Sequence, residues 1–86
     1  MKHADDEALN VLEPLLELLR SINGLREKKR GTFYRKSSAF LHFHEDPEGL
    51  FADLKVDGKW QRFPVNTKRE YSVLSKAAKA ATTLTT

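Results

Sequence analysis

The sequence predicts an α+β fold: an antiparallel β-meander of three to four strands, with an N-terminal and a C-terminal helix packed on one face. Three observations lead to this prediction. Apolar residues recur at helical spacing near both ends of the chain, and they alternate with polar residues in its middle. Asp57-Gly58 stands between two strand-like segments, which is typical of a two-residue type I′ hairpin. The 86 residues, 1–86, suit a single domain with one modest core.

The N-terminal helix is predicted over residues 5–23. Its leucines fall on one helical stripe, made of Leu9, Leu12, Leu16 and Leu19. Pro14 lies inside the stripe, so the helix either kinks there or restarts, with Asn10 as the cap of a firmer second part. Asn23-Gly24 supplies a stop, and residues 26–31 are expected to form a polar connector.

The meander is predicted over residues 32–65, with strands at 32–35, 39–44, 50–56 and 60–65. The first of these either joins the meander or pairs with another molecule. The turn over residues 46–49 allows two registers: an even loop, or a three-residue loop with a glycine bulge. We favour the even loop because it makes one face of the sheet uniformly apolar.

The C-terminal helix is predicted over residues 67–81. Thr67 and Glu70 have capping-box spacing, and the apolar stripe that follows consists of Tyr71, Leu74, Ala78 and Ala81. The tail, residues 82–86, is expected to fray.

The predicted register divides the meander into two faces, because strand side chains alternate. Toward the helices lie Ala39, Leu41, Phe43, Leu50, Ala52, Leu54 and Val65. On the reverse face lie Phe40, His42, His44, Phe51, Asp53, Lys55, Trp60 and Arg62. With no helix left to cover it, this aromatic and ionisable reverse face is the candidate binding surface.

The formal net charge is +3, from 15 Lys and Arg against 12 Asp and Glu. The positive residues gather after the first helix, in a basic segment made of Arg26, Lys28, Lys29, Arg30, Arg35 and Lys36. Such a segment either binds polyanions or is a solvated connector.

The sequence predicts a non-enzymatic interaction domain that uses the reverse face. Self-association or a protein partner is the first hypothesis, since a cluster of aromatic residues on an open sheet is typical of a contact surface. Single-stranded nucleic acid or DNA is the alternative, bound by aromatic stacking and by basic side chains. His42, His44 and Asp53 have the residue types of a metal site. However, a histidine beside an aspartate is more often a surface pair, so neither a metal nor another cofactor is predicted.

Several classes are disfavoured by what the sequence lacks. It has no cysteine, which excludes disulfides and thiolate chemistry. It has no glycine-rich phosphate loop and no nucleophile motif, so no catalytic residue is predicted. Neither a signal-like N-terminus nor an apolar run long enough for a membrane span is present. We therefore expect a cytoplasmic protein without a membrane partner.

The segment from Gly31 to Leu54, which reads GTFYRKSSAFLHFHEDPEGLFADL, resembles a type of short bacterial protein of unknown function. The order helix–meander–helix, with Lys36 before Ala39-Phe40, also resembles the frataxin-like fold and, within it, the MmcQ/YjbR family. DNA binding has been suggested for that family, so the resemblance adds to the nucleic-acid alternative. It implies no functional residue for this chain.

Overall fold

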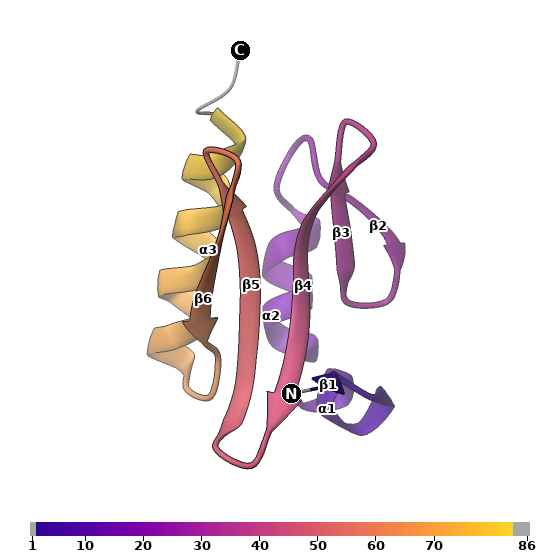
Figure 1. The fold of residues 1–86 in the computed structure, drawn as a ribbon, viewed down its shortest axis with the longest axis vertical. Coiled ribbons are helices and arrows are strands. Elements are labelled where there is room, and N and C mark those ends of the chain that lie inside the picture. Colours follow the sequence, from indigo (N-terminus) through magenta and orange to yellow (C-terminus); the bar gives the residue numbers. More distant parts are fainter. Residues whose placement is uncertain (1, 84–86) are drawn as a thin grey trace.

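A computed structural model describes residues 2–83. In chain order the elements are β1 (Lys2–His3), α1 (Asp6–Val11), α2 (Glu13–Arg20), β2 (Arg26–Lys29), β3 (Thr32–Arg35), β4 (Ser38–Asp46), β5 (Gly49–Val56), β6 (Lys59–Pro64) and α3 (Lys68–Thr83). One antiparallel sheet has the order β2-β3-β4-β5-β6, and β1 pairs with β4. In the view of Figure 1, α2 and α3 lie behind the sheet. The predicted α+β class is confirmed, but the sheet has six strands rather than three or four.

The predicted register of the meander is confirmed. Leu41 pairs with Leu54, and Asp46 pairs with Gly49, so the turn between β4 and β5 has the even loop. Asp57 and Gly58 have φ of 52° and 80°, as a type I′ turn requires at both central residues. From Leu41 onward, side chains that should share a face therefore do so.

The apolar face of the sheet packs against all three helices in one continuous core. Its fully buried members include Leu12, Leu15, Leu16 and Leu19 from the N-terminal helices, Leu41, Leu54 and Val65 from the sheet region, and Leu74 and Ala78 from α3. Within residues 2–83, the opposite face of the sheet carries no helix and is open.

The first helix restarts, which was one of the two predicted outcomes at Pro14. α1 ends at Val11, and α2 begins at Glu13 with Pro14 in its first turn, where a missing N–H costs nothing. The restart occurs at Leu12 rather than at the predicted cap Asn10. Leu12 is fully buried, so core packing rather than a side-chain cap determines where the chain turns.

The predicted polar connector over residues 26–31 is wrong for its first part, because Arg26–Lys29 forms strand β2. β2 pairs with β3, and β3 joins the meander by pairing with β4. Gly31 makes the turn possible: its φ is +81°, and a Cβ at this position would lie 2.6 Å from Cδ2 of Leu9. Only glycine allows this close approach to α1.

Phe40 is not on the open face, contrary to the prediction. The pairing steps from Phe33–Leu41 to Tyr34–Ala39, so Phe40 is the extra residue of a β-bulge in β4. It is 5% exposed and belongs to the core cluster. The bulge breaks the simple alternation on which the sequence prediction relied.

The C-terminal helix ends two residues later than predicted, because Thr82 and Thr83 belong to α3 (Lys68–Thr83) instead of a frayed tail. The rest of that predicted tail, 84–86, lies outside the described residues. The backbone N–H of Glu70 donates to Oγ1 of Thr67, as the capping box predicts, while Oε1 of Glu70 accepts from the backbone of Asn66.

Among residues 2–83, no helix has both the length and the apolar character that a membrane crossing requires.

Candidate functional site on the open face

The open face is defined by side chains that pair across the strands away from the helices. His42, Asp53 and Arg62 form one row, and Lys55 pairs with Trp60 in another. Phe51 lies between His44 and Pro64. Seven of the eight predicted surface residues therefore share this face: His42, His44, Phe51, Asp53, Lys55, Trp60 and Arg62. The eighth is Phe40.

An ion pair between Asp53 and Arg62 occupies the centre of the face. Arg62 donates from Nε to Oδ1 of Asp53 at 2.8 Å and from Nη2 to Oδ2 at 2.9 Å. The Asp53 side chain is only 12% exposed, whereas that of Arg62 is 49% exposed. The hydrogen bonds from Arg62 hold the pKa of Asp53 below its ordinary value, although burial alone would raise it. The positive charge of Arg62 thus balances the negative charge of the Asp53 carboxylate.

Three imidazoles gather beside this ion pair. His42 and His44 point to the same face because they are two positions apart on β4, and the centroids of their rings are 4.8 Å apart. The ring of His3 stacks on His44 with centroids 4.8 Å apart. Nε2 of His44 lies 3.1 Å from Oδ2 of Asp53. Burial, and then the nearby His44, lower the pKa of His42.

His3 reaches the cluster because β1 pairs with the second half of β4. His3 lies opposite His44, and the backbone N–H of Ala4 donates to the carbonyl of Phe43 at 3.1 Å. The backbone N–H of Asp5 donates to the side chain of Glu45. Since β3 pairs only with the first half of β4, this edge of the strand is free for β1.

Lysines lie over aromatic rings at two places on the face. Nζ of Lys55 is 5.1 Å from the ring centroid of Trp60. Nζ of Lys28 is 4.7 Å from the ring centroid of Tyr34, and Arg26 pairs with Tyr34 across the strands. The face therefore combines flat apolar rings with positive charge.

The predicted basic segment does not form one surface. Arg26 and Lys28 face outward with Tyr34. Arg30 instead turns to the helices, where it binds the side chains of Asn10 and Glu13. The three remaining members lie apart from the face: Lys29 lines a hollow, Arg35 donates to the carbonyl of Thr82, and Lys36 is in the β3–β4 turn.

Sequence reasoning missed two residues of this face. Tyr34 follows Phe33, which is buried, so the alternation along a strand could have placed Tyr34 outward. His3 had no such signal, because a strand of two residues shows no periodicity.

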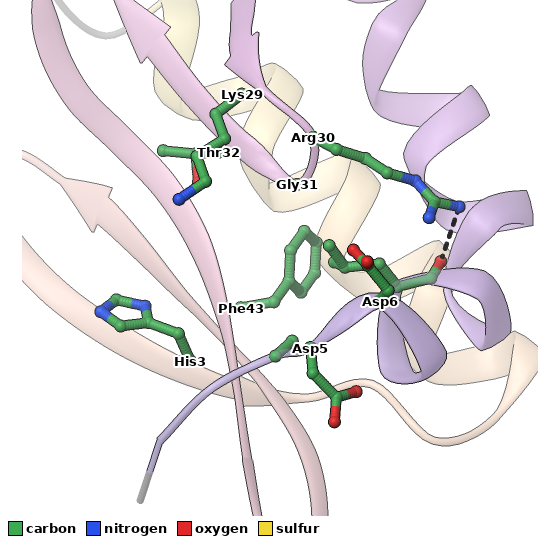
Figure 2. A pocket seen from close by; sticks show the side chains of 10 residues that line it. His3, Asp5, Asp6, Lys29, Arg30, Gly31, Thr32 and Phe43 are labelled. Atoms are coloured by element: carbon green, nitrogen blue, oxygen red, sulfur yellow. Dashed lines mark hydrogen bonds between the residues drawn. The ribbon is translucent and has the colours of Figure 1, made fainter.

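A hollow of about 570 Å³ borders the histidine cluster. His3, Phe43 and Arg30 are among the residues that line it. In Figure 2 the His3 ring lies at one end of the view and the Arg30 guanidinium at the other, with the Phe43 ring between them. Arg30 donates to the carbonyl of Leu9 there, which ties the β2–β3 turn to α1. His3 thus borders both this hollow and the open face.

Comparisons of the chain with protein-family models, with curated proteins and with solved structures gave no match. The resemblance to the MmcQ/YjbR family stays a prediction from the sequence. The function is therefore argued from the site itself.

Proposed function

We propose that this domain binds single-stranded nucleic acid on its open sheet face. The observation that supports this best is the pairing of lysines with aromatic rings that are at least partly exposed, Lys55 with Trp60 and Lys28 with Tyr34. Single strands bind proteins by stacking bases on such rings while Lys and Arg contact the phosphates. Asp53, the carboxylate at the centre of the face, is neutralised by Arg62, so it opposes a polyanion little.

The two ring positions suit a strand that crosses the sheet. Tyr34 is on β3 and Trp60 is on β6, three strand spacings away in the sheet order, which corresponds to about 14 Å. Each ring offers one face for a base. The lysine above it has a flexible stem, so it can move aside to contact a phosphate.

Self-association through the same face stays a prediction from the sequence. It depended on Phe40, Phe51 and Trp60 as three apolar anchors. Phe40 is in the core and Phe51 is partly buried, while Trp60 is 46% exposed. Without Phe40, the open face is more cationic and less apolar than the sequence predicted. This favours a polyanion as its partner over a second copy of the chain.

The test is fluorescence anisotropy with labelled single-stranded DNA and RNA oligonucleotides at several salt concentrations. We expect binding that weakens as salt rises, with a slope in the double-logarithmic plot of about −0.7 per phosphate contact. Duplex DNA of the same length should bind more weakly, since its bases are not free to stack. No binding at low salt, together with dimer formation in light scattering, would favour the self-association hypothesis.

Matched variants locate the surface. Trp60→Ala should weaken binding roughly tenfold, in line with the loss of one stacked base. Val73→Ala, which removes a similarly exposed apolar side chain from α3 (52% exposed), should have no effect. Lys55→Ala should make the dependence of binding on salt less steep, whereas Lys76→Ala on α3 should leave this dependence unchanged. If only the two α3 variants weaken binding, the interface lies on the helices and not on the open face.

A further inference from the structure

The imidazoles of His3, His42 and His44 converge. One ring nitrogen from each lies within 4.8 Å of the others. In a tetrahedral zinc site with Zn–N bonds of about 2.0–2.1 Å, ligand nitrogens are about 3.3 Å apart. Small side-chain rotations would close the difference. His3 has the freedom for them, because it is exposed and belongs to a two-residue strand.

Two buried nitrogens of the cluster have no partner. Nδ1 of His42 and Nδ1 of His44 are buried, and neither makes a hydrogen bond within the described chain. A buried polar atom without a partner lowers the stability of the fold, so such atoms call for an explanation. A bound ion would satisfy them.

Asp53 and Arg62 supply the outer contacts that histidine metal ligands usually have. Nε2 of His44 lies 3.1 Å from the Asp53 carboxylate, which favours the proton on Nε2 and leaves the lone pair on Nδ1. The two hydrogen bonds from Arg62 hold that carboxylate in place. Asp53 is therefore a positioning residue, and its oxygens are already occupied.

We propose that His3, His42 and His44 bind one divalent late transition metal ion, with Zn²⁺ as the ion that fits best. Three neutral imidazoles favour Zn²⁺, Ni²⁺ or Cu²⁺ over Mg²⁺ or Ca²⁺, which prefer oxygen ligands. Three protein ligands leave the fourth position of a tetrahedral ion open. The sequence predicted no metal, because a histidine beside an aspartate is more often a surface pair and His3 was not expected near His42 and His44. This proposal does not rest on nucleic-acid binding.

The experiment is isothermal titration of the full chain with Zn²⁺ at neutral pH, alongside Co²⁺ absorption. We expect one ion per chain and Co²⁺ visible bands of tetrahedral intensity. The chain has three histidines and one tryptophan, and the ring centroids of His42 and Trp60 are 4.8 Å apart. Zn²⁺ should therefore also change the Trp60 fluorescence with the same midpoint.

Single substitutions separate the roles. His42→Ala and His3→Ala should each lower Zn²⁺ affinity by at least about 100-fold, more than the loss of an outer contact costs. Asp53→Asn should lower it by about 10–100-fold and keep the stoichiometry. Asp57→Asn, an exposed carboxylate in the neighbouring turn, should leave it unchanged.

Circular dichroism checks that each variant folds. If His42→Ala does not fold, His3→Ala still decides the matter, because His3 lies on the exposed strand β1. Absence of Zn²⁺ binding at concentrations up to about 100 μM would overturn the proposal, since a weaker site has less than about 5.5 kcal/mol of binding free energy. Equal Zn²⁺ affinity in the wild type and in His3→Ala would overturn it as well.

Discussion

The two faces of the sheet are built from the same strands, but one is covered by helices and apolar, while the other is open and polar. On the covered face, Leu41 and Leu54 are fully buried by packing against helices. On the open face, Asp53 and the two strand histidines are largely buried by their neighbours within the face, and two ring nitrogens have no partner. The covered face contributes stability through apolar burial. The open face has a polar arrangement with two unpartnered ring nitrogens, which the proposed metal ion would satisfy.

The largest effect is expected for Phe40→Ala. If Phe40 belongs to the covered side, the substitution should lower the free energy of unfolding by about 3–5 kcal/mol, measured by urea denaturation. Phe40→Leu is a milder variant that should cost less than about 1.5 kcal/mol. Val11→Ala, at a position 62% exposed, is the control and should change stability by less than about 0.5 kcal/mol. If Phe40→Ala lowers the free energy of unfolding by less than about 1 kcal/mol, Phe40 lies on the open face and not in the core.

His42→Leu should raise stability while it removes metal binding. The substitution replaces an imidazole whose Nδ1 has no partner by an apolar side chain of similar size, so a gain of about 1 kcal/mol is expected. The measurement is urea denaturation with a chelator, which removes any stabilisation of the wild type by bound ion. His3→Leu, at an exposed position, should bring no gain. A clear loss of stability in His42→Leu would mean that its ring has a structural role.

Trp60→Ala should change the free energy of unfolding by less than about 1 kcal/mol, because the Trp60 side chain is half exposed on the edge strand β6. Its effect should be confined to binding. Thermal unfolding monitored by circular dichroism is the measurement. Unfolding of the variant at room temperature would show that the open face contributes to the core.

The smallest effect on stability is expected for Glu13, which lies at the start of α2. Hydrogen bonds from Arg30 and then Arg20 lower the pKa of Glu13 from 4.5 to about 2. Because the folded state has the lower pKa, Glu13 stabilises the fold above pH 4.5, and this contribution is lost as the pH falls toward 2. The difference in melting temperature between wild type and Glu13→Gln should shrink over this interval. Glu48→Gln, at an exposed position between β4 and β5, is the control, and a pH-independent difference for Glu13→Gln would contradict the assignment.

Local patterns were enough to predict the centre of the molecule. The Asp57-Gly58 turn requires two positive φ angles, and strand alternation then places His42, Asp53 and Arg62 in one row. Both are short-range properties of the chain. This is why most residues of the open face could be predicted from the sequence.

The features that complete the candidate sites depend on tertiary contacts. The bulge that turns Phe40 into the core arises from the pairing of β3 with β4, and the restart at Leu12 is governed by packing in the core. Strand β2 is recognisable only through its partner β3, since its residues are polar throughout.

The sequence by itself determined the α+β class and the pairing of β5 with β6, and it favoured one of two registers at the β4–β5 turn, which the structure confirms. Only the tertiary structure decided that His3 joins His42 and His44. The physical reason is range: turn chemistry and side-chain alternation act over a few residues, whereas pairing of β1 with β4 joins residues about forty positions apart through backbone hydrogen bonds that any residue type can make.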